Sequence, residues 1–193
     1  MSFTQKIRFI NMEDYPRVLE IYAPYIMETA ISFEAEVPTL EAFSQRIEKI
    51  SSKFPWLVYE ENGQVLGYAY GSTHRSRYAY NWSCEVTVYL DQKHTKKGIG
   101  SSLYNQLFTM LKEQGFYNLF AGITQPNEAS NRIHEKLGFK KIGTYENIGF
   151  KFSKWHDVSW YQLEINAGDN PQPPRPLSRG LKEKLLSSNP SPA

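Results

Sequence analysis

The sequence has little of several features that mark whole classes of protein. It holds one cysteine, Cys84, in 193 residues, so an internal disulfide framework is excluded and a reducing compartment is favoured. No apolar run approaches the length of a membrane span, and the N-terminus carries no long apolar stretch. The formal net charge is only +2, without the basic stripe typical of nucleic-acid binders. We therefore expect a cytoplasmic protein whose partners include neither nucleic acid nor a membrane.

Two common ligand signatures are also missing. The four histidines are scattered, and no cluster has the spacing of metal ligands, so we expect no metal site. The glycines of residues 95–100 are not followed by Lys-Ser/Thr at the spacing of a Walker loop, and the third glycine of a dinucleotide fingerprint is absent. A nucleotide-binding protein of either type is thereby disfavoured.

The composition predicts one folded domain and a tail. With 40% hydrophobic and 15% aromatic residues, the chain can bury one good core, which we place over residues 1–166. From Gly168 onward the sequence is rich in Pro, Ser and Lys and cannot build a core. We expect residues 167–193 to be a Pro/Ser-rich tail that is mobile or laid along another surface.

Hydrophobic periodicity predicts an α/β (α+β) chain. Helices are expected after Asn11 and Thr39, which can cap them, and over 99–114 and 128–137. Asn62-Gly63 is a strong hairpin signal. Strands are expected around 7–9 and at 56–60, 65–72, 81–90, 118–122, 140–148 and 155–165. The predicted fold is a mixed, mostly antiparallel central sheet flanked by about four helices.

The most informative segment joins a strand to a helix through a basic, glycine-bearing loop. The strand carries Glu85 and ends near Leu90, and Gly98 and Gly100 precede an apolar-periodic helix. This order aims backbone N–H groups and the positive end of a helix at one place, which suits a phosphate. The two glycines could instead simply permit a tight turn. Together with the carboxylate on the strand, the loop suggests an enzyme that uses a phosphorylated cofactor.

The loop resembles the pyrophosphate loop of the GNAT acetyltransferase superfamily, which reads Arg/Gln-x-x-Gly-x-Gly/Ala. Here the stretch is Thr95-Lys96-Lys97-Gly98-Ile99-Gly100, so a Thr stands in the first position. The later run from Pro126 to Asn131, followed by Leu137-Gly138-Phe139, resembles the second cofactor segment of that superfamily. The resemblance implies acetyl-CoA as co-substrate. Its implied binding residues are Val86, Val88, Thr95, Lys96, Lys97, Gly98, Ile99, Gly100, Ser101, Asn127 and Ser130.

Further motifs narrow the resemblance to the phosphinothricin N-acetyltransferase family, over about residues 7–165. They are Ile31–Glu34, Trp82–Tyr89, His134–Phe139, Gly149–Lys151 and Trp155–Val158. The resemblance implies acetylation of the α-amino group of a small amino acid of the phosphinothricin or methionine sulfoximine type. It also implies a homodimer.

Two residues are candidate catalysts on this resemblance. Glu85 matches the proposed base, and burial on a central strand could raise its pKa toward useful values; the alternative is a carboxylate that faces solvent or pairs with an Arg. His134 stands where many superfamily members carry a Tyr that protonates the leaving thiolate, and a His there can act as acid or base. The alternative is a histidine that only packs on a neighbour. Cys84 should point to the opposite face of the strand from Glu85.

The expected substrate side combines a basic loop with two further residues. Arg75, Arg77 and Tyr80 precede the Glu85 strand and could hold anionic groups of an amino acid, although a solvated basic loop is the alternative. Phe33 and Thr87 complete the expected substrate-binding set, with a core position the alternative for Phe33.

Two other functions stay open. One is an acetyltransferase for a different amine, such as a polyamine or a protein N-terminus, which the basic loop disfavours for polyamines. The other is a catalytically inactive acyl-CoA-binding module, which the presence of both Glu85 and His134 argues against.

Overall fold

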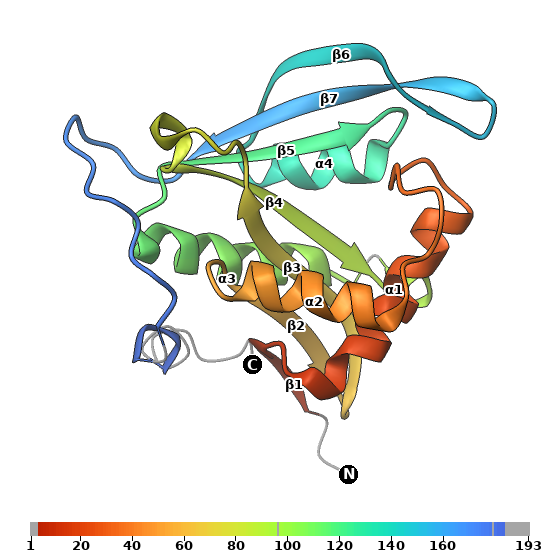
Figure 1. Ribbon diagram of the computed structural model, residues 1–193, viewed down its shortest axis with the longest axis horizontal. Helices are drawn as coiled ribbons and strands as arrows, with labels where there is room; N and C mark the ends of the chain where they lie inside the picture. Colours follow the sequence, from red (N-terminus) through yellow and green to blue (C-terminus); the bar gives the residue numbers. More distant parts are fainter. Residues whose placement is uncertain (1–3, 96, 179, 184–193) are drawn as a thin grey trace.

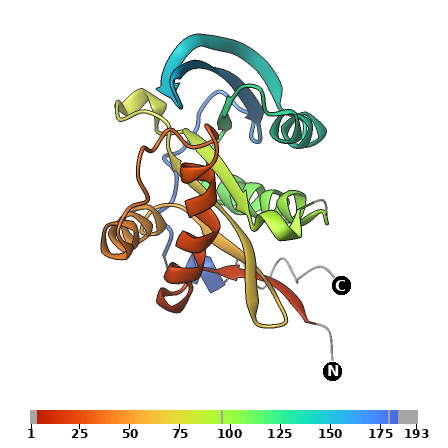
Figure 2. The same cartoon turned by 90° about the vertical axis from the view of Figure 1, so that its right-hand side faces the viewer.

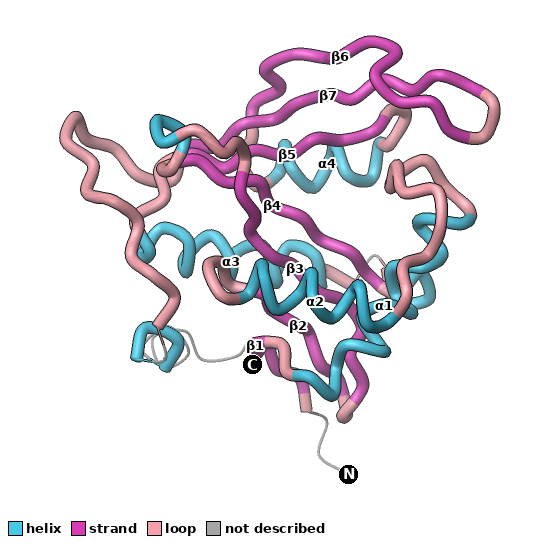
Figure 3. The backbone as a smooth tube through the Cα atoms, in the orientation of Figure 1, coloured by secondary structure: helices cyan, strands magenta, loops and turns pink. Residues whose placement is uncertain are grey.

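The computed structural model describes residues 4–95, 97–178 and 180–183. Within them the chain forms one seven-stranded sheet, four α-helices and three short 3-10 turns (Figures 1 and 3). The strands are β1 (Gln5–Phe9), β2 (Trp56–Glu61), β3 (Gln64–Thr73), β4 (Ser83–Leu90), β5 (Asn118–Thr124), β6 (Lys140–Lys151) and β7 (Lys154–Glu164). The helices are α1 (Tyr15–Met27), α2 (Leu40–Ser51), α3 (Ile99–Gln114) and α4 (Glu128–Lys136), and the turns are η1 (Met12–Asp14), η2 (Tyr78–Tyr80) and η3 (Gln92–His94).

Local sequence signals set the helix ends. Asn11 and Asp14 form a reciprocal capping box around η1, which runs directly into α1. The Thr39 hydroxyl accepts a hydrogen bond from the Ala42 amide at 3.2 Å and so caps α2. Gly115 ends α3 in the left-handed conformation, with φ of +98°, where the missing Cβ removes the steric penalty.

The sheet order is β1-β2-β3-β4-β5-β7-β6, and every neighbouring pair is antiparallel except β4 and β5. The parallel pair requires a crossover, which α3 supplies. The prediction of a mixed, mostly antiparallel sheet with four helices is confirmed. Two strands run further than the periodicity predicted, because their pairing with β7 continues: β5 pairs as far as Thr124 and β6 as far as Lys151.

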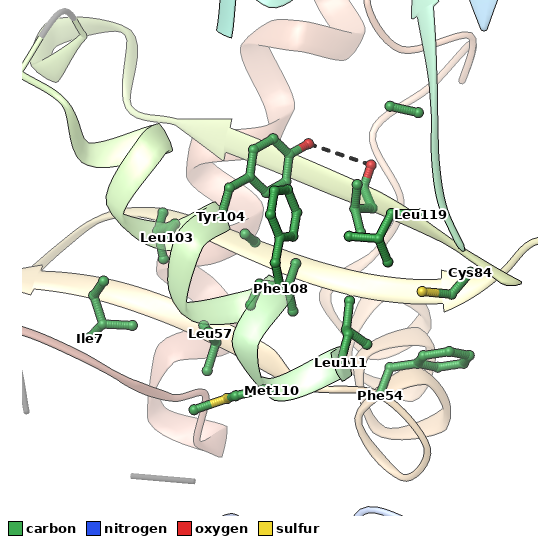
Figure 4. Close-up of a cluster of buried hydrophobic side chains, with 14 of the residues drawn as sticks. Ile7, Phe54, Leu57, Cys84, Leu103, Tyr104, Phe108, Met110, Leu111 and Leu119 are labelled. Carbon is green, nitrogen blue, oxygen red and sulfur yellow. Dashed lines mark hydrogen bonds between the residues drawn. The ribbon is translucent and has the colours of Figure 1, made fainter. Parts of the chain in front are cut away.

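Helices cover both faces of the sheet. Figure 2 shows α1 and α2 on one side of the strands and α3 and α4 on the other. Tyr89 of β4 packs its ring against Tyr22 and Tyr25 of α1. On the other face Val86 belongs to the core that surrounds α3, and Figure 4 shows the large side chains of this core. Strand β4 therefore has one face toward α1 and the other toward α3.

Residues 170–178 lie along the domain. The Trp82 indole N–H donates to the Gln172 carbonyl at 2.9 Å, the Arg175 amide donates to the Gln114 carbonyl at 2.7 Å, and Leu177 is buried. Of the two placements considered for the tail, mobile or laid along another surface, these contacts match the second as far as Leu177. The mobility of the tail and the domain boundary at 166 stay predictions, and residues 184–193 lie outside the described part.

In the described part of the chain, none of the helices combines the length and the apolar character needed to cross a bilayer.

Candidate functional site

Strands β4 and β5 separate in the middle of the sheet and leave a cavity between them. Their parallel pairing covers only Ser83–Glu85 with Asn118–Phe120. Beyond Glu85 the two strands diverge around a cavity of about 110 Å³. Six residues expected from the sequence line it: Val86, Thr87, Val88, Asn127, Ser130 and His134. The structure thus brings together residues from one strand and one helix that lie more than 35 positions apart in the chain.

The β4 backbone presents polar groups to this cavity. The Val86 carbonyl oxygen lies 3.5 Å from the Tyr104 hydroxyl oxygen, so that carbonyl points away from β3. Because backbone groups alternate along a strand, Val88 directs its N–H and C=O to the same side, beyond the last residue that pairs with β5. A strand that lacks a partner there can hydrogen-bond an extended ligand.

Helix α4 places three candidate residues on the cavity. The Asn127 side chain caps the helix by accepting from the Ser130 amide at 3.1 Å. His134 lies one turn after Ser130, whose carbonyl accepts a hydrogen bond of 2.8 Å from the His134 Nδ1. The helix therefore fixes the orientation of the His134 ring through a local i, i+4 contact.

The surroundings of His134 favour the neutral form of its ring. With its proton on Nδ1, its Nε2 accepts a hydrogen bond from the Tyr104 hydroxyl at 3.2 Å. The His134 ring is buried against Phe139, and burial lowers its pKa although the bond to the Ser130 carbonyl opposes this. Burial also raises the pKa of Tyr104. The ring of His134 packs on its neighbours and also offers a nitrogen to a hydroxyl at the cavity, so its catalytic role stays a prediction.

Glu85 faces the other side of the sheet. Its carboxylate Oε1 accepts a hydrogen bond of 3.0 Å from Nδ1 of His74, and its side chain is 34% exposed. Burial raises the pKa of the Glu85 carboxyl, while the bond to His74 and the charge of Arg75 oppose the rise. The two alternatives considered from the sequence were a carboxylate that faces solvent and one that pairs with an Arg. Neither describes this environment, because Glu85 lies on a central strand and its hydrogen-bond partner is a histidine.

The expected pyrophosphate loop lies open at the start of α3. Gly98 is the N-cap of α3 with φ of +79°, and no atom lies within 4 Å of the place where its Cβ would be. The first-turn N–H groups of α3, from Ile99 to Ser101, have no partner within the helix. Thr95 and Lys97 are exposed beside them, and Lys96 lies outside the described residues. The backbone here fits an anion.

Gly100 has a packing reason of its own. A Cβ at this position would lie 3.0 Å from Cδ1 of Ile133 and 3.6 Å from Cδ1 of Leu90. Its missing side chain lets α4 and β4 approach α3 closely. A larger residue would therefore disturb the core as well as the loop.

The basic loop does not line the cavity between β4 and β5. The Arg75 guanidinium lies over the Tyr80 ring, 5.8 Å from its centroid, and Arg77 is exposed immediately before η2. Arg75 and Tyr80 instead line a larger cavity of about 680 Å³, walled on one side by Pro173 and its neighbours in the tail. The link between this loop and Glu85 is His74, whose ring centroid lies 6.1 Å from that of Tyr80.

Phe33 lies outside the cavity between β4 and β5. Its side chain is 42% exposed and covers Gly149 of the β6–β7 hairpin so closely that a Cβ there would lie 2.2 Å from the ring. Lys151 ties the same hairpin to the loop after α1, since its Nζ donates to the carbonyls of Ile26 and Ser32 at 2.6 and 2.7 Å. The residue of this loop that lines the cavity is Ile31, which was not among the predicted site residues.

Sequence reasoning missed His74 and Tyr104. Tyr104 falls on the apolar stripe of α3 and reads as a core residue, so only its hydroxyl could have signalled a second role. No motif or spacing in the sequence around His74 marks it as part of the site. Cys84 is fully buried on the face opposite Glu85, where burial raises its thiol pKa, in agreement with its expected orientation.

Comparison with known proteins gives the same family throughout. The acetyltransferase (GNAT) domain model matches residues 7–160. Phosphinothricin N-acetyltransferase of Streptomyces viridochromogenes is 36% identical over 174 residues, which cover 90% of this chain and 95% of that protein. L-methionine sulfoximine/L-methionine sulfone acetyltransferase of Salmonella typhimurium is 32% identical over 161 residues, covering 83% of this chain and 94% of that protein.

A solved structure agrees with these relatives. It is a GNAT superfamily phosphinothricin acetyltransferase from Sinorhizobium meliloti in complex with acetyl-CoA, with a TM-score of 0.83 and 30% sequence identity. The match covers 89% of this chain and 94% of that one.

Proposed function

Because this chain belongs to the GNAT acetyltransferase family and is an acetyltransferase, we propose that it moves the acetyl group of acetyl-CoA to the α-amino group of a small amino acid. Phosphinothricin and methionine sulfoximine are the type of acceptor that we propose. The observation that carries the proposal is the cavity between β4 and β5, with a carboxylate on one side of the sheet and a buried histidine on the other.

Acetyl-CoA is proposed to bind on the face of the sheet that α3 and α4 cover. The pyrophosphate would rest on the Ile99–Ser101 amides at the start of α3, with Thr95 and Lys97 beside it. The pantetheine arm would run through the cavity past Val88, Asn127 and Ser130, which line it. The diverging strands support this path because they leave the Val88 amide without a partner on β5.

Glu85 is the proposed general base. The acceptor enters as an ammonium ion, and its nitrogen must lose a proton before it can attack the thioester carbonyl. Burial raises the pKa of the Glu85 carboxyl, which makes the carboxylate a better proton acceptor near neutral pH. On this assignment the amine approaches from the α1–α2 side of β4, opposite His134.

His134 and Tyr104 are proposed to serve the leaving thiolate. Their hydrogen bond joins an imidazole nitrogen to a hydroxyl at the cavity wall. A thiolate that forms there can take the hydroxyl proton of Tyr104 as Nε2 of a protonated His134 returns a proton to the phenolic oxygen. One S–H and one O–H bond form, one O–H and one N–H bond break, and His134 is left neutral with its proton on Nδ1, so the pair supplies the acid that one Tyr supplies in many superfamily members. Burial removes competing water from this transfer.

The acceptor is proposed to be anionic. Arg75, Arg77 and Tyr80 supply donors on the loop that reaches Glu85 through His74. Thr87, on the Glu85 face of β4, and Phe33, on the loop after α1, complete the proposed acceptor side.

Thiol release from acetyl-CoA separates this function from its alternatives. The assay uses phosphinothricin, methionine sulfoximine, other amino acids, spermidine and a peptide with a free N-terminus. We expect the first two to give the highest kcat/KM. Preference for spermidine or for the peptide would assign the chain to another amine, and no release with any acceptor despite acetyl-CoA binding would indicate an inactive binding module.

We also propose a homodimer. Strands β6 and β7 expose a group of large apolar side chains, among them Ile148 at 54%, Phe150 at 62% and Trp155 at 60%. The rings of Phe150 and Trp155 pack on each other, with centroids 5.3 Å apart. Apolar surface of this kind is covered in many oligomers. Light scattering that gives a monomer mass across micromolar concentrations would contradict the proposal.

A further inference from the structure

We propose that His74 is a positioning residue for Glu85: it holds Oε1 of the carboxylate, so that Oε2 is the oxygen that takes the proton from the acceptor amine. The inference rests on the proposed function and assigns a role within that site. It starts from the 3.0 Å hydrogen bond between Nδ1 of His74 and Oε1 of Glu85.

The surroundings of His74 fix its ring. The ring is stacked on Phe120 of β5, with centroids 4.4 Å apart and an angle of 11° between the planes. Trp160 of β7 meets the His74 ring edge-on at 5.9 Å, and the side chain of His74 is only 12% exposed. Phe120 is also the residue that pairs with Glu85 across β4 and β5. The imidazole is thus clamped beside the last paired residue, where the strands begin to diverge.

This clamp leaves one orientation for the carboxylate. A free Glu side chain turns about its terminal bond with little preference, and a base must be within about 3 Å of the proton that it removes. With Oε1 held by His74, the unoccupied Oε2 is the atom available to the amine. As the amine loses its proton, one N–H bond breaks and one O–H bond forms at Oε2, and the nitrogen lone pair is freed to attack the thioester carbonyl. The Nδ1 proton stays on His74.

Other groups near Glu85 act at longer range. The Arg75 guanidinium favours the ionised carboxylate through its charge, and the hydroxyl of Tyr70 on β3 and the thiol of Cys84 on β4 both feel the negative charge of Glu85. Tyr80 faces His74 rather than Glu85. Within the described residues, His74 is the side chain that hydrogen-bonds the carboxylate directly. Removing that donor should therefore raise the pKa of Glu85 and free its orientation.

Two substitutions test this role. In His74→Phe the ring can still stack on Phe120 but donates no hydrogen bond, whereas in His74→Asn the amide nitrogen stands at the same number of bonds from Cβ as Nδ1. We expect His74→Phe to lower kcat about tenfold or more, the scale of losing a hydrogen bond to a charged group. The acidic limb of the kcat/KM profile should move to higher pH, with the acetyl-CoA KM unchanged. His74→Asn should recover most of both losses.

A second measurement is independent of catalysis. The carbon-13 NMR titration of the Glu85 carboxyl, in the protein without substrates, should give a higher midpoint in His74→Phe than in the wild type and a restored one in His74→Asn. Failure of the wild type to release thiol with any amine would overturn the proposed function and leave this shift readable. An unchanged midpoint with unchanged kcat in His74→Phe would overturn the role of His74 and leave acetyl transfer intact. Equal kcat losses in both variants, with no shift of the midpoint, would reduce His74 to a packing residue.

Discussion

The two faces of β4 carry the same kind of polar pair in different surroundings. On the α1–α2 side a histidine donates to the Glu85 carboxylate at a partly exposed position, and on the α3–α4 side the buried His134 accepts from the Tyr104 hydroxyl. Burial shifts the two pKa values in opposite directions, raising that of Glu85 and lowering that of His134. The cause is the same on both faces, because burial disfavours the charged form of each group.

The different exposure of Glu85 and His134 matches the different roles proposed for them. A base that meets a soluble acceptor needs an accessible carboxylate, and the side chain of Glu85 is 34% exposed. A group that protonates the thiolate leaving a buried thioester works best where water is excluded, and His134 is buried. The divergence of β4 from β5 joins the two faces, because it lets one ligand reach the strand from α3 while another meets it from α1.

The largest expected effect comes from removing the carboxylate charge on the open face. Glu85→Gln keeps the size of the side chain and should lower kcat by about 10²-fold or more. In the wild type the rate should fall as the pH falls through the pKa of Glu85, because the protonated carboxyl cannot accept a proton; this limb should vanish in the variant. Glu41→Gln, at the exposed start of α2, is the matched control. A near-normal kcat at neutral pH would clear Glu85 of the role.

The next effect separates the acceptor from acetyl-CoA. Arg77→Ala should raise the KM for phosphinothricin by about ten- to a hundredfold, since a charge-assisted contact is worth about 1.5–3 kcal/mol. The acetyl-CoA KM should stay nearly constant because the loop does not line the cavity between β4 and β5. Arg132→Ala, exposed on α4 and paired to Glu128, controls for the loss of a surface charge. If both KM values moved together in Arg77→Ala, the loop would not be an acceptor clamp.

The smallest effect is expected on the buried face. Tyr104→Phe removes the hydroxyl that His134 accepts from, and we expect a few-fold to tenfold fall in kcat and a loss of about 1 kcal/mol of stability. Tyr25→Phe is the matched control. The Tyr25 hydroxyl also donates to a carbonyl of β4, that of Leu90 at 2.6 Å, but away from the cavity. Thermal unfolding and kcat measured on both variants should show equal destabilisation but a kinetic defect in Tyr104→Phe alone. Equal kinetics would leave Tyr104 a core residue.

The parts of the site that the sequence predicted are those built from local spacing. The loop before α3 is indicated by two glycines and the helix that begins after them. Asn127, Ser130 and His134 are expected from the resemblance to the superfamily, and helical spacing then places them along α4. The parallel crossover between β4 and β5 follows the same logic, since a helix of 16 residues separates the strands.

The parts that the sequence could not predict depend on contacts between distant segments. His74 meets Glu85 only because β3 and β4 pair antiparallel with Ser72 opposite Glu85, and a shift of one residue in that register would turn one of the two side chains away. Tyr104 meets His134 only when α3 and α4 approach as closely as Gly100 allows. The placement of the tail against Gln114 likewise has no signal in its Pro-rich composition.

The claim that two substrates meet across β4 is tested most directly by a crystal structure with coenzyme A and an acceptor amino acid bound together. We predict the pyrophosphate at the start of α3, the thiol in the cavity beside Val88 and the acceptor nitrogen within about 3 Å of Oε2 of Glu85 on the α1–α2 side. An acceptor nitrogen bound on the His134 side of the strand, or out of reach of Glu85, would contradict the account.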